Sequence, residues 1–291
     1  MSSIDSQQRI ASACVCCGSD HLSRSPAILM PFVAARVFDW YPVVIDESWG
    51  LKTIQNGHAY SICTSLLCQD CGLLFLDMRF SDAELGKLYS DYRGKEYSEL
   101  REQFEPGYVS RNTLLNEGVP FLAKVEEFIR PHLQFPIAIL DWGGDTGNNT
   151  PFKGENCLFH IYDISNKPVI DGAIAVDAAT ATITQYQLII CSQVLEHTPY
   201  PSKVIESMKQ AMSADTLLYI DVPYEEHMRN SATESILSKK KHWHEHINFY
   251  SPKSLRTLVQ SCGLRVVDEN ILLVAGREKE IAMLQIICRL K

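Results

Sequence analysis

The chain has 291 residues, of which 21% are charged, and its formal net charge is −8. This length allows one large domain with an appendage, or two domains, and a sizeable buried core. The acidic balance argues against a surface built mainly to hold nucleic acid or an anionic membrane. The sequence opens without a signal peptide and contains no apolar run of transmembrane length, so we expect a cytoplasmic protein with reduced cysteines.

Two short segments repeat the pattern Cys-x-x-Cys-Gly, one beginning at Cys14 and the other at Cys68. Zinc prefers four soft ligands in a tetrahedron, and two residues between thiolates let each pair wrap one edge of it. The pattern therefore predicts a structural zinc ion on four thiolates: Cys14, Cys17, Cys68 and Cys71. The alternative is two buried cysteine pairs without a metal, because buried free cysteines are common.

The residues between the two cysteine segments hold more apolar clusters than a minimal zinc ribbon needs. Pro31-Phe32-Val33 is one of them. These clusters either pack the ribbon onto its neighbour or form a wall of a substrate site.

After the second cysteine segment, the apolar run 73–76 predicts a short strand. Ser81 and Glu84 then have the spacing of a capping box, which predicts that a helix begins there.

The segment 88–108 interleaves tyrosines with basic residues, among them Tyr89, Tyr97 and Arg101. It is either an amphipathic surface helix or a surface that hydrogen-bonds a polar substrate.

Apolar residues at helical spacing then predict a helix over 112–129, which ends before Pro131. We therefore expect a zinc-binding region with a helical linker over 1–108 and a second domain over 109–291.

From residue 137 onward, short apolar runs alternate with helical patterns, which is typical of a doubly wound α/β sheet. The run 137–140 enters a glycine-rich turn ending at Gly147, and such a turn lets the backbone approach a ligand at the carboxyl edge of the sheet. Further strands are predicted over 158–162, 172–176, 187–191, 217–221, 264–267 and 283–290. We expect a seven-stranded, Rossmann-like sheet whose last strand is antiparallel.

Acidic residues follow two of these strands. Asp163 stands at the tip of the second strand, about twenty positions beyond the first, where such folds hold the ribose hydroxyls of a nucleoside. Asp177 follows the third strand and is placed to reach an adenine amino group. A helix-capping role for Asp163 is the alternative. The glycine turn and Asp163 together predict a nucleoside-containing cofactor.

At this point the chain resembles the class I S-adenosylmethionine (SAM)-dependent methyltransferases. Four segments carry the resemblance: Leu140-Asp141-Trp142-Gly143-Gly144-Asp145-Thr146-Gly147, Tyr162-Asp163-Ile164-Ser165, Val176-Asp177-Ala178 and Ile189-Ile190-Cys191-Ser192-Gln193-Val194-Leu195-Glu196-His197. The resemblance implies a cofactor site for SAM on these residues: Asp141, Gly143, Gly144, Asp145, Gly147, Asp163, Ile164, Asp177, Ala178 and Gln193. Many members carry glycine where this chain has Asp145, whose carboxylate either pairs with the ammonium of SAM or repels its carboxylate.

The cysteine segments joined to such a domain are similar to the sugar C-methyltransferases that act on nucleotide-linked keto-sugars, and to their relatives in polysaccharide biosynthesis. The segment Trp243-His244-Glu245-His246-Ile247-Asn248-Phe249-Tyr250-Ser251 strengthens the likeness. The resemblance implies that Glu245 and His246 supply acid/base chemistry, with Trp243 in place of an expected tyrosine. We expect methyl transfer to carbon or oxygen of a small polar acceptor, most simply a sugar or a nucleotide-linked sugar.

The role of each residue in this segment follows from its chemistry. Histidine titrates near neutrality, so we expect His246 to remove a proton from the acceptor, with Glu245 orienting it or a substrate hydroxyl. The alternatives for this histidine-rich segment are a second metal site and a polar loop hydrogen-bonded to the sheet. The insertion 224–241 ends in three lysines and is either a lid or a solvated charge run.

Two other functions fit the same sequence. Some RNA methyltransferases resemble this arrangement, although phosphate contacts favour a basic chain and this one is acidic. A non-catalytic member of the fold, which binds the cofactor or a partner without transferring methyl, is the other alternative, because a fold alone does not establish a function.

Overall fold

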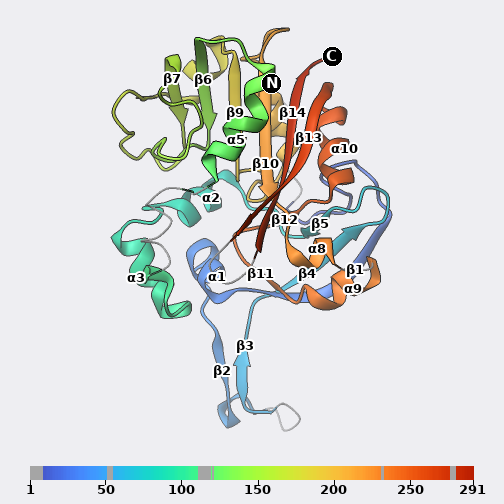
Figure 1. Cartoon of the computed structure of the whole chain (residues 1–291). Helices are drawn as coiled ribbons and strands as arrows, with labels where there is room; N and C mark the ends of the chain where they lie inside the picture. Colours follow the sequence, from blue (N-terminus) through green and yellow to red (C-terminus); the bar gives the residue numbers. More distant parts are fainter. Residues whose placement is uncertain (1–8, 51–54, 111–118, 120, 231–232, 276–279) are drawn as a thin grey trace, which may run out of the picture.

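The computed structural model of the chain describes residues 9–50, 55–110, 119, 121–230, 233–275 and 280–291. Figure 1 shows two parts, one above the other. The upper part is a large sheet with helices, and the lower part is a smaller sheet built mainly from N-terminal residues, with a projecting hairpin. Within the described residues, no helix is long and apolar enough to cross a membrane.

The large sheet has seven strands, as predicted. In spatial order they are β13 (Leu264–Ala275), β14 (Glu280–Leu290), β10 (Leu217–Pro223), β9 (Leu188–Ser192), β6 (Ile137–Trp142), β7 (Asn156–Tyr162) and β8 (Ile174–Ala175). The strand pairs β10–β9, β9–β6, β6–β7 and β7–β8 are parallel. Strand β14 is antiparallel to both of its neighbours, β10 and β13. Every residue of β6 is buried, as expected of a parallel strand covered on both faces.

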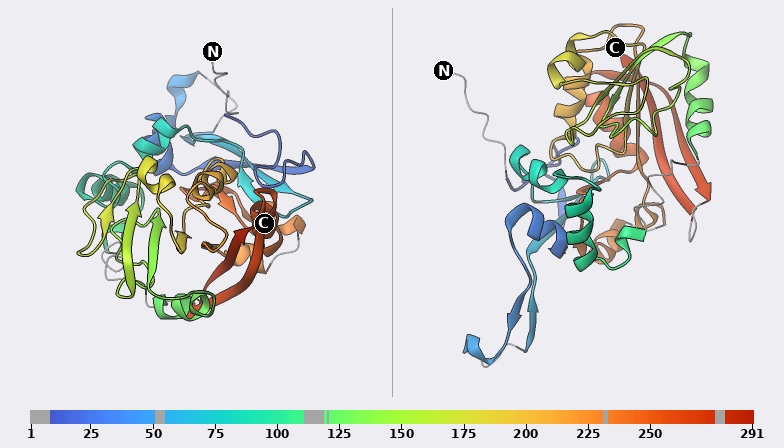
Figure 2. Two further views of the ribbon diagram at one scale, coloured as in Figure 1. Left: turned by 90° about the horizontal axis from the view of Figure 1, so that it is seen from above. Right: turned by 90° about the vertical axis from the view of Figure 1, so that its left-hand side faces the viewer.

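Helices cover both faces of this sheet, as the two views of Figure 2 show. On one face, α5 (Leu122–Ile129), continued by η2 (Arg130–His132), packs Val125 and Ile129 against β6. On the other face lie α6 (Ala178–Ile183), α7 (Pro201–Lys209) and α10 (Pro252–Ser261). The first part of the helix predicted over 112–129 lies outside the described residues.

The smaller sheet has five strands. In spatial order they are β11 (His242–Trp243), β1 (Leu22–Leu29), β4 (Ile62–Cys68), β5 (Leu74–Leu76) and β12 (Asn248–Phe249). The predicted strand 73–76 is therefore present as β5. Because β11 and β12 follow β10 in the chain, this sheet takes strands from both sides of the boundary that the sequence predicts at residue 109.

Three helices accompany the smaller sheet: α1 (Pro31–Phe38), α2 (Asp82–Tyr89) and α3 (Lys95–Phe104). The apolar cluster at 31–33 belongs to α1, where Phe32 and Val33 are fully buried, so packing accounts for it. The predicted capping box of α2 is present. Ser81 Oγ accepts from the backbone N–H of Glu84, and the Glu84 carboxylate accepts from the backbone N–H of Ser81.

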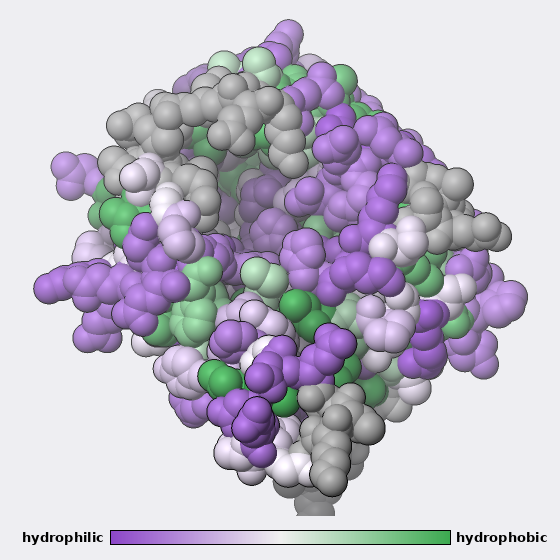
Figure 3. Space-filling model, turned by 90° about the horizontal axis from the view of Figure 1, so that it is seen from below, coloured by the Kyte–Doolittle hydropathy of each residue, from purple (hydrophilic) through white to green (hydrophobic). Residues whose placement is uncertain are grey.

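The projecting hairpin is formed by β2 (Val43–Ile45) and β3 (Gly57–Ala59), with η1 (Glu47–Trp49) beyond β2 (Figures 1 and 2). Seen from below, the molecule is largely hydrophilic with small hydrophobic patches (Figure 3). The insertion after β10 contains α8 (Glu226–Arg229) and α9 (Thr233–Lys239). Lys240 is not fully solvated, because its Nζ lies 4.2 Å from the ring centre of Phe249.

Candidate active site

The glycine turn after β6 requires glycine at two of its positions. Gly143 has a φ of 85°, and a Cβ atom there would lie 2.4 Å from Cγ2 of Val194. Gly147 has a φ of 83°, and its Cβ would lie 3.0 Å from Cδ1 of Ile161. Glycine adopts such a left-handed backbone conformation without strain, and it has no Cβ atom that would clash with these neighbours. The turn therefore brings bare backbone to the carboxyl edge of the sheet.

Asp145 and Asp163 meet at this edge. The backbone N–H of Asp145 donates to Oδ2 of Asp163 over 2.9 Å, and that of Ser165 donates to Oδ1 over 2.8 Å. The carboxylate of Asp145 forms an ion pair with Lys167 Nζ at 2.9 Å. Asp145 has a φ of 51°, which explains why glycine suits this position. Lys167, for which no role was predicted, neutralises the carboxylate of Asp145.

The other predicted cofactor residues divide into exposed and inward-facing ones. Asp177 is exposed and caps α6, since its Oδ1 accepts from the backbone N–H of Thr180 over 2.8 Å. Ile164 and Ala178 are exposed as well. Gln193 Nε2 instead donates to Asp221 Oδ1 over 2.6 Å. Its side chain is therefore held by the end of β10.

Two buried carboxyl groups lie beneath the turn. Asp141 accepts from Thr150 Oγ1 over 2.5 Å, and burial raises its pKa to about 7. Asp221 accepts from Ser192, Gln193 and Tyr219, and burial raises its pKa as well. Asp221 is the last residue of the strand predicted over 217–221, and no role in the site was predicted for it. Its position at the carboxyl end of β10 was the available signal.

A cavity of about 420 Å³ lies beside the glycine turn. Its lining residues are Arg93, Asp145, Thr146, Asn148, Asn149, Lys167, Pro168, Val169 and Ile170. Arg93 belongs to the tyrosine-rich segment 88–108, whereas the other lining residues belong to the loops after β6 and β7. The N-terminal part of the chain therefore contributes directly to the site around the predicted cofactor turn.

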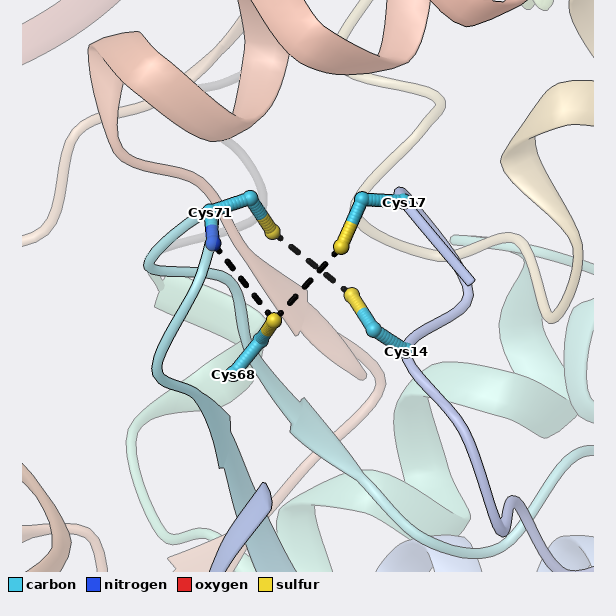
Figure 4. A group of neighbouring side chains, drawn as sticks. All are labelled: Cys14, Cys17, Cys68 and Cys71. Atoms are coloured by element: carbon cyan, nitrogen blue, oxygen red, sulfur yellow. Dashed lines mark hydrogen bonds between the residues drawn. The ribbon is translucent and has the colours of Figure 1, made fainter. Parts of the chain in front are cut away.

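The four cysteines of the two Cys-x-x-Cys-Gly segments converge, as Figure 4 shows. The sulfur atoms of Cys14 and Cys71 are 3.6 Å apart, as are those of Cys17 and Cys68. Zinc with sulfur ligands at about 2.3 Å in a tetrahedron needs sulfur atoms about 3.8 Å apart. The backbone N–H of Cys71 also points at Cys68 Sγ. Both of these sulfur pairs therefore lie close to the spacing of a zinc tetrahedron, and all four sulfur atoms lie within 4.8 Å of one another.

Glu245 is held by residues of α3. Its carboxylate accepts from Tyr97 Oη and from Arg101 Nη1, each over 3.1 Å. Arg101 also forms an ion pair with Glu105, whose carboxylate contacts His244 Nε2. Burial alone would raise the pKa of Glu245, but His244 and Arg101 lower it to about 2. Glu245 is therefore an ionised carboxylate at neutral pH, fixed by the tyrosine-rich segment.

His246 lies beside a second histidine. The ring centres of His246 and His197 are 4.5 Å apart. His197 Nδ1 lies 2.7 Å from Tyr89 Oη and 3.2 Å from the backbone oxygen of Glu245. Burial and the neighbouring His197 lower the pKa of His246 to about 3. His246 is therefore neutral at physiological pH, and in this environment its ring is a weaker base than an ordinary histidine.

Backbone hydrogen bonds join this histidine cluster to the loop after β9. The backbone N–H groups of Ile247 and Asn248 donate to the backbone oxygen of Glu196 over 2.7 and 3.0 Å. Val194, on the same loop, contacts the glycine turn at Gly143. One loop therefore contacts both the predicted cofactor turn and the predicted acid/base segment.

The chain is similar to several known methyltransferases. The C-methyltransferase NovU of Streptomyces niveus is 33% identical over 91 residues, which are 31% of this chain and only 20% of that protein. The 1,6-didemethyltoxoflavin-N1-methyltransferase of Burkholderia thailandensis has a TM-score of 0.48 at 13% identity, covering 77% of this chain and 96% of its own. A SAM-dependent methyltransferase from Methanosarcina mazei has a TM-score of 0.41 at 13% identity, covering 56% and 96%.

A family model gives the broader result. The model described as "Methyltransferase domain" matches residues 111–269, which run from before β6 to within β13 and include the glycine turn, Asp163 and the histidine cluster. This match takes in more than half of the chain, so the chain belongs to the methyltransferase-domain family.

Proposed function

We propose that the chain transfers the methyl group of SAM to carbon or oxygen of a small polar acceptor, a sugar or a nucleotide-linked sugar. The observation that carries this proposal is the loop after β9. Its Val194 contacts the glycine turn, and its His197 lies 3.2 Å from the backbone oxygen of Glu245. A methyl donor on the turn would therefore lie close to residues that can bind hydroxyl groups and remove a proton.

The proposed SAM site follows the predicted residues. It consists of Asp141, Gly143, Gly144, Asp145, Gly147, Asp163, Ile164, Asp177, Ala178 and Gln193. SAM supplies an electrophilic methyl group on a sulfonium. The absence of a side chain at Gly143 and Gly147 lets the backbone approach the cofactor, and Asp163 keeps acceptor capacity for ribose hydroxyls beyond its two backbone contacts. The Lys167 partner of Asp145 reduces the repulsion that its carboxylate would exert on the carboxylate of SAM.

Asp163→Asn is expected to weaken SAM binding about tenfold or more, because a neutral amide replaces an ionised acceptor of two hydroxyl hydrogen bonds. Isothermal titration calorimetry with SAM measures the dissociation constant. Asp171→Asn is the matched control, because Asp171 is an exposed aspartate outside the proposed site. An unchanged dissociation constant for Asp163→Asn would remove Asp163 from the ribose site.

The chemical step assigns different roles to Glu245 and His246. His246 takes the proton of the acceptor hydroxyl, or of the carbon beside a carbonyl, as the methyl group is transferred. The ionised Glu245 raises the pKa of His246, against the effect of burial, and so stabilises the imidazolium that forms. Glu245 remains ionised on Arg101 and Tyr97. It binds an acceptor hydroxyl, and its backbone oxygen orients His197. The polar network on α3 keeps this segment in place during turnover.

Replacing His246 with alanine is expected to lower the turnover number by about 10²- to 10⁴-fold, because the acceptor proton loses its base. SAM affinity should not change, since His246 is not part of the proposed cofactor site. A radiolabelled-SAM assay gives the rate, and calorimetry gives the affinity. His242→Ala is the control, because His242 is exposed on β11. Full turnover by His246→Ala would contradict the base role.

The acceptor class is tested by offering purified chain and labelled SAM to nucleotide-linked keto-sugars, free sugars and transfer RNA in parallel. We expect label in a nucleotide-linked sugar and none in RNA, because the net charge of −8 disfavours a polyanion. Label in RNA alone would overturn the proposed acceptor. SAM binding without label in any acceptor would favour a non-catalytic role.

We also propose that Cys14, Cys17, Cys68 and Cys71 bind one structural zinc ion. The convergence of the four sulfur atoms supports this proposal, since those of Cys14 and Cys71 and those of Cys17 and Cys68 lie 3.6 Å apart. A divalent cation would offset the mutual repulsion of four thiolates held this close. The four sulfurs leave no position for a substrate, which is typical of a structural site.

A further inference from the structure

Glu196 is a buried carboxyl group without a hydrogen-bond partner. The residue is 1% exposed, and neither carboxylate oxygen forms a hydrogen bond within the described part of the chain. A buried carboxyl that lacks a partner costs free energy, so such groups are rare outside functional sites. Glu196 has no role in the proposed SAM site or in proton removal. A ligand bound to the carboxylate oxygens of Glu196 would remove the free-energy cost of burying them without a partner.

Two imidazoles face this carboxylate. His197 Nε2 lies 3.8 Å from Glu196 Oε1, too far for a hydrogen bond. Glu196, His197 and His246 each offer one possible ligand atom, and these three atoms lie within 4.8 Å of one another. Transition-metal ions bind histidine and carboxylate at about 2.0–2.2 Å, which places two ligand atoms about 3–4 Å apart. A cation between them would need only small side-chain movements.

The surroundings of His197 match those of a metal-binding histidine. Its Nδ1 is already engaged by Tyr89 Oη at 2.7 Å and by the backbone oxygen of Glu245 at 3.2 Å. The Nε2 atom is therefore the one directed at Glu196. Metal-binding histidines characteristically use their second nitrogen in this way, because the contact fixes the ring and its tautomer. The backbone hydrogen bonds from Ile247 and Asn248 to Glu196 hold the segments that carry the three side chains together.

We propose that Glu196, His197 and His246 bind a divalent transition-metal cation, with Zn²⁺ as the first candidate. Two imidazoles and one carboxylate are a donor set that suits Zn²⁺, Fe²⁺ and Mn²⁺, and three protein ligands leave a position open for an oxygen atom. Under the proposed function, that oxygen is a hydroxyl or carbonyl of the acceptor. A bound cation would hold that oxygen and lower the pKa of its hydroxyl, with His246 as a ligand and the released proton passing to water.

Metal content tests the site without any assay of methyl transfer. Tag-free chain is equilibrated with ZnCl₂, freed of unbound metal and analysed by inductively coupled plasma mass spectrometry. We expect two zinc ions per chain, one on the four cysteines and one on the Glu196 site. Glu196→Gln and His246→Asn should each retain one. The controls Glu226→Gln and His242→Asn, which change exposed residues, should retain two.

Substitution with Co²⁺ assigns the second ion to its ligands. Cobalt on the cysteine thiolates gives intense sulfur-to-metal charge-transfer absorption, whereas cobalt on histidine and carboxylate gives only weak d–d bands. The second equivalent should add d–d absorption without charge transfer, and Glu196→Gln should abolish that addition. A thermal melt of each variant shows that it is folded, and His246→Asn is an independent test should Glu196→Gln fail to fold.

The outcomes separate this proposal from the proposed function. A single zinc ion in the parent chain, or two in both Glu196→Gln and His246→Asn, would overturn the cation site. If methyl transfer to a sugar persists in that case, the proposed function stands with His246 as the base. Two zinc ions without methyl transfer to any acceptor would support the cation site and overturn the function.

Discussion

Replacing Cys71 with serine is expected to remove one equivalent of zinc from the chain and to destabilise the smaller sheet severely. A structural zinc site contributes about 10–16 kcal/mol of binding free energy in small zinc-binding peptides, and this energy is available only to the folded chain. Even a small part of it is a large share of the stability of a typical domain. We therefore expect the free energy of unfolding to fall by at least about 3 kcal/mol.

The effect should extend beyond the cysteines. Cys68 ends β4, and Cys71 lies in the turn before β5. The backbone oxygen of Cys71 accepts a hydrogen bond from Ser251 Oγ over 3.1 Å, and Ser251 is the N-cap of α10 on the large sheet. Loss of the metal therefore loosens a contact between the two sheets. Thermal denaturation followed by circular dichroism, with zinc analysis of the same sample, measures both effects.

Cys16→Ser is the matched control for this substitution. Cys16 is buried next to the cluster, but its sulfur donates to the backbone oxygen of Ser254 over 2.9 Å, a contact that a serine hydroxyl can also make. The Cys16 variant should keep its zinc and most of its stability. Zinc content that is the same in Cys71→Ser and in the parent chain would show that the four thiols do not hold the metal.

The large sheet was predictable from sequence because its central strands are buried on both faces. Continuous apolar runs such as Ile137–Leu140 have no other simple explanation when glycine and acidic residues follow them. The last two strands were predicted too short. β13 and β14 continue as a long hairpin in which Ile271, Leu273 and Ile281 are nearly half exposed. The run 271–275 is itself apolar, but the polar residues 268–270 separate it from the strand predicted over 264–267.

The smaller sheet was less predictable, because its edge strands come from a remote part of the chain. β11 and β12 contain two residues each and have no pattern that distinguishes them from a loop. Trp243 was noted only as a departure from an expected tyrosine. In the structure it is fully buried in β11, and its Nε1 donates to Ser65 Oγ over 2.8 Å. Strand pairing across such sequence distances depends on the tertiary fold.

The candidate site shows the same division between local and long-range information. Motif positions identified Asp163, Glu245 and His246, and their roles remain predictions. Their partners were not identified, because Arg101 and Tyr97 lie on a segment whose sequence also fits an exposed amphipathic helix. Only the fold brings that segment to Glu245, at 3.1 Å from both side chains. Sequence patterns reveal the chemistry of a residue more readily than the neighbours that tune it.

Arg79 is a further residue that sequence reasoning passed over, and its removal is expected to have the second large effect. Its side chain is 1% exposed, and within the described residues no carboxylate forms an ion pair with it. The guanidinium instead donates to Asn248 Oδ1 and to the backbone oxygens of Pro199, Ile247 and Leu76. Leu76 and Asn248 belong to two strands of the smaller sheet, and Pro199 and Ile247 belong to the loops that carry His197 and His246.

Arg79→Met is expected to lower the free energy of unfolding by at least about 3 kcal/mol. Methionine fills much of the space, but it removes the guanidinium donor from four buried acceptors, and each buried group left unsatisfied costs about 1–3 kcal/mol. The backbone oxygen of Ile247 still accepts from the backbone N–H of Leu76. For a chain of this size the melting temperature should fall by roughly 5–10 °C. Burial lowers the pKa of Arg79 to about 10, so the guanidinium remains charged at neutral pH and the loss includes its charge-assisted hydrogen bonds.

Two further variants define what Arg79 does. Arg265→Met removes an exposed arginine from β13 and should leave the melting temperature nearly unchanged. Arg79→Lys keeps the charge but has three donors on one atom, so it cannot reach acceptors that surround a planar guanidinium and should retain only part of the stability. Because Arg79 joins the loops of His197 and His246, Arg79→Lys should also lower methyl transfer at temperatures where it remains fully folded. Parent-like stability and turnover in Arg79→Met would show that other contacts hold these loops together.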